Sequence, residues 1–194
     1  FADLLHYLHR KACKPSLVTY QSDIVRQRRL MKLYRPLMTR FLNSMDQVVA
    51  TSPDYLRTSP VLSQLECRLD VIPNGLDESS CPPASEQMLA RWRQVVGEGF
   101  FLFVGVLRYY KGLDKLFRAA ARVKGLIVIA GAGPEQERLR ALAEAGAVKN
   151  VHFLGHVSDL DKAALLHLAG GFVFPSHLRA EAFGMSLIEA AMYA

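Results

Sequence analysis

FFLFVGVLRYYKGLDKLFRAAARVKGLIVIAG, residues 100–131, predicts a strand, a helix and a second strand in succession. Residues 100–107 and 125–131 are short apolar runs, which are typical of buried strands. Between them Leu113, Leu116 and Phe117 recur at the spacing of one helix face. Two strands joined through a helix pair in parallel by a right-handed crossover. The stretch therefore predicts an α/β layer.

The same alternation continues toward the end of the sequence. Apolar runs predict strands at 151–155 and 170–176. Helices are expected from Pro134 to Gly146, after the caps Ser158 and Asp159, and from about Gly184 onward. The fold class is therefore α/β with a doubly wound parallel sheet, which binds its ligands at the carboxyl ends of the strands. The loops expected to meet there are 105–111, 131–134, 155–158 and 175–184.

The first third of the chain repeats this scheme less completely. Strands are predicted at 16–21, 47–52 and 68–74, and helices at 2–12, 24–45 and 53–59. A turn-rich linker at 75–87 and a polar helix at 88–99 lead into the second part. We expect further elements before Phe1, and we interpret the chain as a fragment because it ends within a predicted helix.

The composition bounds the class of protein. With 194 residues, 51% of them hydrophobic, the chain can bury a core, and no apolar run approaches the roughly 20 residues of a membrane span. Cys13, Cys67 and Cys81 lie far apart without a CxxC pair, so neither a disulfide framework nor a zinc site is predicted. A reducing cytosol fits this cysteine usage best.

Basic residues gather in one stretch of a chain whose formal net charge is +6. Such a cluster attracts lipid headgroups, nucleic acid or phosphorylated substrates, and the alternative is an ordinary solvated helix face. The cluster consists of Arg26, Arg28, Arg29, Lys32, Arg35 and Arg40.

The segment HLRAEAFGMSLIEAAMYA, residues 177–194, holds two glutamates with seven residues between them. If a helix begins near Gly184, Glu181 lies in the loop before it and Glu189 in its second turn. The free N–H groups at a helix start suit a diphosphate, and carboxylates accept hydrogen bonds from sugar hydroxyls. The alternative is a pair of ordinary solvated glutamates.

A second group of charges is predicted at the same rim of the sheet. Arg108 and Lys111 lie in the loop that follows the first strand of this part. Fixed cations there would offset the charge that grows on a departing diphosphate. The alternative is a lysine at a helix start beside a surface arginine.

Several motifs together resemble the glycosyl transferases of group 1, which are family 4 of the retaining enzymes with the GT-B fold and include bacterial mannosyltransferases. The resemblance covers the chain but about half of a complete family enzyme, and it implies two Rossmann-like units, both incomplete. Residues 1–76 would end the acceptor domain, 77–98 would form the linker and leading helix, and 99–194 would begin the donor domain. The motifs are LVTYQSDIVRQ, LYRPLMTRFL, VVATSPDYL, VIPNGLD, FLFVGVLRYYKGLDKL, IAGAGPE, VHFLGHVSD and EAFGMSLIEA.

The resemblance implies roles for individual residues. Glu181 would bind hydroxyls of the donor sugar, Glu189 the nucleotide ribose and Lys111 the phosphates, with Glu181 and Lys111 as the catalytic pair. Main-chain N–H groups of Phe183, Gly184 and Met185 would contact the diphosphate or sugar. His156 and Val157 would line the base pocket, beside the turn IAGAGPE, whose glycines would serve the fold.

Two positions depart from the family pattern. Family members carry an arginine two residues after the loop glycine, whereas Gly105 is followed by Val106 and Leu107, and Arg108 comes one place later. Many relatives have histidine where Gln21 stands on the acceptor side. Glutamine cannot take up a proton at neutral pH, so Gln21 is not expected to act as a general base.

The resemblance implies retaining transfer of a hexose, for instance mannose from GDP-mannose, to a lipid-linked saccharide or glycan. No cofactor and no required metal are expected, and His6 and His9 lack the acidic or cysteine companions of a metal site. The basic helix 24–43 would meet anionic lipid at the inner face of the cytoplasmic membrane. The fragment alone is expected to be inactive.

Other readings explain parts of the pattern. A nicotinamide oxidoreductase would use IAGAGPEQE, but the third glycine of the dinucleotide fingerprint is replaced by Gln136. A nucleotide-sugar epimerase of the same fold, or a non-catalytic nucleotide-sugar-binding fragment, stays open. A nucleic-acid binder would use the net positive charge, but the sequence has no recognition motif for it.

Overall fold

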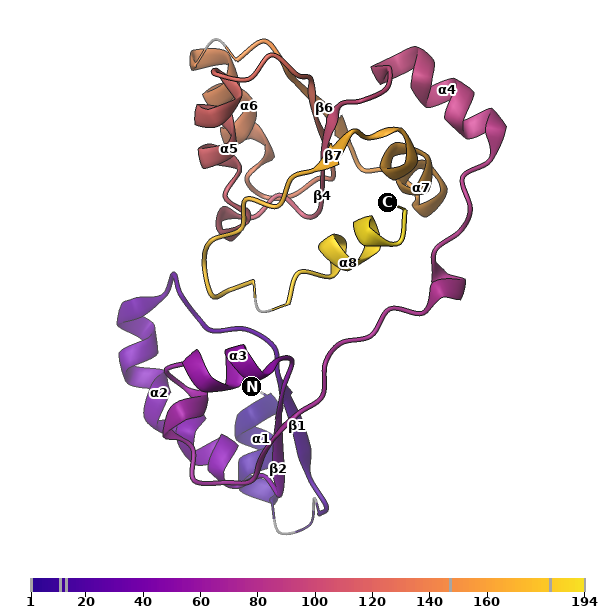
Figure 1. Cartoon of the computed structure of the whole chain (residues 1–194). Coiled ribbons are helices and arrows are strands. Elements are labelled where there is room, and N and C mark those ends of the chain that lie inside the picture. Colours follow the sequence, from indigo (N-terminus) through magenta and orange to yellow (C-terminus); the bar gives the residue numbers. More distant parts are fainter. Residues whose placement is uncertain (1, 11, 13, 147, 182, 194) are drawn as a thin grey trace. The chain divides into compact units, whose positions relative to one another are not determined.

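The computed structural model describes residues 2–10, 12, 14–146, 148–181 and 183–193 (Figure 1). The chain divides into two compact units. Unit 1 comprises Phe1–Gly75 and Leu178–Phe183, and unit 2 comprises Leu76–His177 and Gly184–Ala194. The assignment of 1–76 and 99–194 to acceptor and donor domains stays a prediction.

The sheet of unit 2 is parallel throughout, as the apolar runs predicted. Its strands lie in the order β6-β5-β4-β7, and Phe101 pairs with both Ile127 and Gly171. Strand β7 is shorter than the predicted 170–176: Val173 still donates from its N–H to the Leu102 carbonyl at 2.8 Å, and Pro175 beyond it has no N–H to donate. The strands are β4 Phe101–Val104, β5 Ile127–Ala130, β6 Val151–Gly155 and β7 Gly171–Phe172.

Helices cover both faces of this sheet, which confirms the doubly wound arrangement (Figure 1). Leu102 and Val128 pack with α4 and α7 on one face, whereas Phe103 and Ile129 pack with α5 and α6 on the other. The alternation follows from the two-residue period of a strand. The helices are α4 Glu86–Val96, α5 Leu113–Ala120, α6 Gln136–Ala145, α7 Asp159–Leu168 and α8 Met185–Ala191.

Helix α7 is fixed at its start and against α4. The Ser158 hydroxyl accepts a hydrogen bond from the Asp161 N–H at 3.1 Å and donates to the Asp161 carboxylate at 2.7 Å. The same carboxylate accepts the indole N–H of Trp92 at 2.9 Å. Burial alone would raise the pKa of Asp161, but these hydrogen bonds outweigh it and the pKa lies below its ordinary value.

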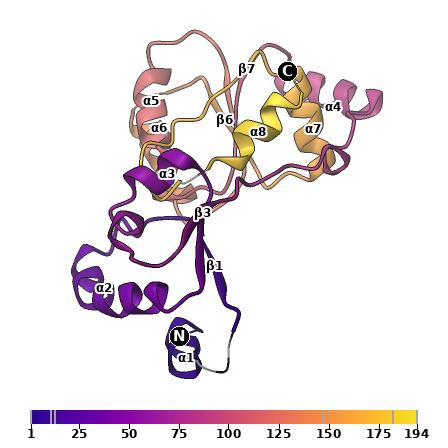
Figure 2. The same cartoon turned by 60° about the horizontal axis from the view of Figure 1, so that its bottom comes forward.

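Unit 1 has a three-stranded parallel sheet in the order β1-β2-β3, with α2 packed against it (Figure 2). Met38, Phe41 and Leu42 of α2 contribute to one core with Val48 and Ala50. The long predicted helix begins at Arg28 rather than at residue 24, and residues 24–27 lie outside it. The elements are α1 Ala2–His9, β1 Leu17–Tyr20, α2 Arg28–Asn43, β2 Gln47–Ala50, α3 Pro53–Thr58 and β3 Leu69–Val71.

Short single turns of 3-10 helix were not predicted. They are η1 Leu62–Gln64, η2 Glu78–Ser80 and η3 Tyr109–Lys111. Cys67 and Cys81 are free thiols, and Cys13 lies outside the described residues. Among the residues that the structure describes, no helix combines the length and apolar character needed to cross a bilayer.

We expect Asp161→Ala to lower the free energy of unfolding of the full-length protein by about 2 kcal/mol, because the variant loses a helix cap and leaves the Trp92 N–H without its acceptor. Urea unfolding at pH 7 measures the change. Asp159→Ala on the exposed side of the same turn is the control and should cost less than about 0.5 kcal/mol.

The effect should depend on pH. A carboxyl whose folded pKa is lowered contributes stability above its unfolded pKa and loses it as the pH falls through the folded pKa. The difference between wild type and Asp161→Ala should therefore be full above about pH 5 and shrink in more acidic solution. A difference that stays constant down to pH 2 would contradict this assignment.

Candidate active site

The loop after β4 is held by the loop after β5. The N–H of Leu107 donates to the carbonyl of Ala132 at 3.0 Å, and the carbonyl of Leu107 accepts from the N–H of Glu135 at 3.1 Å. A Cβ at Gly131 would lie 2.0 Å from the Gly105 carbonyl oxygen, and one at Gly133 would lie 2.6 Å from the Leu107 nitrogen. The glycines of IAGAGPE are therefore required for this close approach.

Lys111 ends this loop as the last residue of η3 and is 9% exposed. Its Nζ lies 5.7 Å from the ring centroids of both Tyr110 and Phe174. The ring of Phe174 also contacts Gly184, where a Cβ would lie 2.7 Å from Phe174 Cζ. Lys111 and the start of α8 therefore meet the same aromatic ring.

The loops after β4 and β7 are packed together at a break in strand order. A Cβ at Gly112 would lie 2.2 Å from the Pro175 carbonyl oxygen. After β4 the chain passes to α5 on one face of the sheet, whereas after β7 it reaches α8, whose Ala190 packs against the core of the other face. Such a switch point is where doubly wound sheets bind ligands.

Glu189 lies in the second turn of α8, as predicted, and it has a partner that was not predicted. Its Oε1 accepts a hydrogen bond from Nζ of Lys162 at 3.1 Å. Burial lowers the pKa of Lys162, but the hydrogen bonds with Asp159 and Glu189 more than offset this, and the pKa is raised. Lys162 is a residue on another helix, and its sequence spacing gives no signal of this contact.

Glu181 and Gln21 both belong to unit 1. Gln21 is exposed and follows β1, whereas Glu181 is partly buried and its N–H donates to the Leu178 carbonyl at 3.0 Å. The N–H of Asp23 donates to the carbonyl of Arg179 at 3.4 Å, so the segments that carry Gln21 and Glu181 lie side by side. Two predicted site residues that are 160 positions apart are thus on adjoining segments.

The remaining predicted site residues differ in exposure and in the unit to which they belong. Arg108 and His156 are exposed, and Val157 packs partly against the core beneath α7. Phe183 and Met185 are partly buried on either side of Gly184. Lys111 and Glu189 belong to unit 2, whereas Glu181 groups with unit 1, so the convergence of Lys111 with Glu181 stays a prediction.

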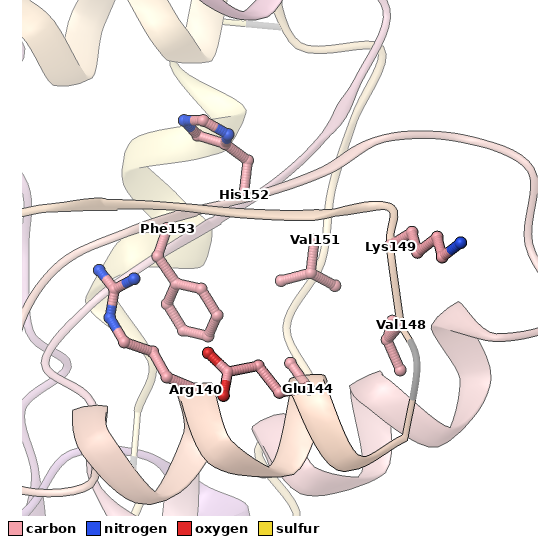
Figure 3. Close-up of a pocket in the computed structure, with 8 residues that line it drawn as sticks. Arg140, Glu144, Val148, Lys149, Val151, His152 and Phe153 are labelled. Atoms are coloured by element: carbon pink, nitrogen blue, oxygen red, sulfur yellow. The ribbon is translucent and has the colours of Figure 1, made fainter.

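A hollow of about 580 Å³ lies elsewhere in unit 2, between α6 and β6 (Figure 3). Val151 and Phe153 point toward α6, and His152 points to the opposite side of the strand. The guanidinium of Arg140 lies 4.8 Å from the ring centroid of Phe153. None of the predicted site residues lines this hollow. Within the described ranges, no three His, Cys, Asp or Glu side chains gather in a way that could hold a metal ion.

The fold defines a doubly wound α/β protein with helices on both faces of a parallel sheet. Over residues 85–194 the sequence matches the family described as Glycosyl transferases group 1. This match spans more than half of the chain, and the chain belongs to that family.

Two curated relatives align with the whole chain. D-rhamnosyltransferase WbpZ of Pseudomonas aeruginosa is 56% identical over 193 residues, which is 100% of this chain and 50% of the relative. O-antigen chain mannosyltransferase C of Escherichia coli is 48% identical over 194 residues, which is 100% of this chain and 52% of the relative. The chain therefore spans about half the length of these relatives.

Solved structures show the same fold at low identity. Sucrose-phosphate synthase from Thermosynechococcus elongatus has a TM-score of 0.79 and 23% identity, covering 97% of this chain and 51% of that one. Anabaena HepE in complex with UDP and glucose has a TM-score of 0.79 and 21% identity, covering 99% and 55%. WaaG, a glycosyltransferase involved in lipopolysaccharide biosynthesis, has a TM-score of 0.69 and 18% identity, covering 98% of this chain and 60% of that one. The predicted GT-B class is confirmed.

We expect Gly112→Ala to lower the free energy of unfolding of the full-length protein by about 3 kcal/mol. The left-handed φ of +71° strains any side chain, and the new methyl group would also meet the Pro175 carbonyl. Gly99→Ala is the control, since Gly99 has a φ of +73° with open space around it. The control should cost only about 1 kcal/mol in the same urea titration, and equal losses would contradict the close contact.

Proposed function

We propose that the whole protein is a retaining glycosyltransferase that moves a hexose from a nucleoside-diphosphate sugar to a saccharide acceptor. Membership of the glycosyl transferases of group 1 supports the reaction class. The observation that carries the site is the buried Lys111, which shares the Phe174 ring with the start of α8 at the switch point of the sheet.

The proposed chemistry needs charge stabilisation and positioning. Lys111 offsets the negative charge that develops on the departing diphosphate, and the Phe174 and Tyr110 rings keep its ammonium group in place. Main-chain N–H groups of Phe183, Gly184 and Met185 contribute to the same phosphates or the sugar. Surrounding side chains exclude water, which strengthens these interactions.

The two glutamates bind hydroxyl groups. Glu189, held by Lys162, accepts hydrogen bonds from the ribose, and Glu181 accepts them from the donor sugar. Gln21 positions the acceptor without taking its proton, and the departing phosphate receives that proton on the same face of the sugar. Arg108 lies at the phosphate end, whereas Gly105, His156 and Val157 belong to the donor side. The proposal assigns no step to a metal or a cofactor.

The proposed donor is GDP-linked mannose or its 6-deoxy form. The relatives at 56% and 48% identity are named as a D-rhamnosyltransferase and a mannosyltransferase of the O-antigen chain. D-rhamnose is 6-deoxymannose, so the two sugars present the same ring hydroxyls to a protein. We accordingly propose a lipid-linked saccharide of polysaccharide biosynthesis as the acceptor.

In the full-length protein we expect Lys111→Ala, Glu181→Ala and Glu189→Ala each to lower donor turnover by about 100-fold or more. Lys115→Ala removes an exposed lysine four residues after Lys111 and should keep wild-type turnover. Release of GDP from GDP-mannose in the presence of a lipid-linked acceptor measures the rate. Wild-type rates in all three variants would refute the site.

Product analysis with labelled donor separates this reaction from the epimerase alternative. A transferase moves the label to the acceptor, whereas an epimerase converts the sugar nucleotide without any acceptor. Acceptor-independent conversion would replace the proposed function. Binding of donor without turnover by the full-length protein would leave only a nucleotide-sugar-binding role.

We further propose that α2 meets anionic lipid at the cytoplasmic membrane face, where the acceptor is held. Arg29, Lys32 and Arg40 are exposed on α2, and Leu33 among them is 82% exposed. Basic residues at an anionic surface contribute about 1 kcal/mol each, and an apolar side chain between them can enter the headgroup layer.

We expect Arg29→Glu with Lys32→Glu to weaken binding of the full-length protein to vesicles containing one-third phosphatidylglycerol by at least about 10-fold. The control, Arg118→Glu with Arg122→Glu, makes the same change of net charge at exposed residues in and after α5. Cosedimentation measures the bound fraction. Equal loss in both variants would argue for net charge alone, and no loss would argue against the use of α2.

A further inference from the structure

The loop Leu178–Phe183 groups with unit 1, although β7 before it and α8 after it belong to unit 2. Arg179 makes two hydrogen bonds that hold this loop. Its carbonyl accepts from the N–H of Asp23 at 3.4 Å, and its Nη1 donates to Oγ1 of Thr58 at 3.0 Å. One residue thus fastens the loop through both its main chain and its side chain.

Thr58 is a well-oriented acceptor for this guanidinium. Its hydroxyl donates to the carbonyl of Asp54 at 2.5 Å, so its only proton is committed and its lone pairs are available to Arg179. Thr58 is the last residue of α3, whose first turn is capped by Ser52 accepting from the N–H of Tyr55 at 3.0 Å. The acceptor therefore lies on a helix that is fixed at its start.

Asp23 is an equally fixed donor. Its side chain is buried, and its Oδ1 accepts the hydroxyl of Tyr20 at 3.1 Å and that of Ser59 at 2.9 Å. Burial, and then the charge of Asp23, raise the pKa of Tyr20 and of Tyr55 well above the ordinary value, so both phenols stay protonated. These contacts join the end of β1 to the end of α3 and set the direction of the Asp23 N–H.

The anchored residue lies two positions before Glu181, inside one turn. The N–H of Glu181 donates to the carbonyl of Leu178 at 3.0 Å, which closes the turn 178–181 around Arg179. We infer that Arg179 is a positioning residue, which sets the place of the Glu181 carboxylate by fastening its turn to Thr58 and Asp23. This inference rests on the proposed role of Glu181 toward the donor sugar.

The test uses the full-length protein and two readouts. Arg179→Ala should lower kcat by about 10- to 100-fold, because small misplacements of a positioned group are costly. Binding of GDP alone, measured by calorimetry, should change by less than about twofold, because the nucleotide is assigned to Lys111 and Glu189 rather than Glu181. Arg179→Lys, which keeps a donor, should recover part of the lost kcat.

A double-mutant cycle tests the specific contact. Thr58→Val should lower kcat in the same direction, and adding it to Arg179→Ala should cause little further loss, since the contact is already gone. Arg57→Ala is the matched control, because it removes an exposed guanidinium from the neighbouring position of α3, where it pairs with the Asp54 carboxylate at 2.8 Å. The control should keep wild-type kcat.

The outcomes separate this inference from the proposed function. Wild-type kcat in Arg179→Ala, with Glu181→Ala inactive, would overturn the inference and leave the function standing. Loss of GDP binding in Arg179→Ala as large as the loss of kcat would also overturn it, because the variant would then disturb the fold broadly. Wild-type turnover in Glu181→Ala would instead remove the site proposal itself.

Discussion

The contact between the main chain at Gly112 and the carbonyl of Pro175 is the constraint on which the candidate site depends. It joins the loops that follow β4 and β7. These strands are neighbours in the sheet, and the helices that follow them lie on opposite faces of it. This close approach brings Lys111 near the ring of Phe174, which in turn contacts Gly184. The cation and the start of α8 therefore meet at one aromatic ring because the main chains of the two loops pack closely.

The fold was largely predictable because its signals are local. Apolar runs of four to eight residues predicted the strands, and the N-cap Ser158 predicted the start of α7. The predictions were less accurate at the ends of strands and helices. Strand β7 ends before Pro175, and the single turn Tyr109–Lys111 within the predicted loop before α5 was not predicted. Residues 24–27 were predicted to be helical but lie outside α2.

The site was predictable only as separate pieces. The family resemblance pointed to the motif around Glu181 and Glu189 and to the loop with Lys111 as candidates, and their roles stay predictions. The contact of Glu189 with Lys162, and that of Arg179 with Thr58, join helices and loops that are distant in sequence. No spacing rule predicts such pairs, because they depend on how complete elements pack.

In the described sheet β6 pairs only with β5, so its other edge is open. A bare edge of this kind can template the addition of strands from other molecules, which leads to aggregation. The hollow between α6 and β6 is lined by Arg140 of α6 and by Lys149, which precedes β6, and cationic side chains near an edge discourage that pairing by mutual repulsion. Neutralising these two residues to ease crystallisation would therefore remove a safeguard against self-association at high protein concentration.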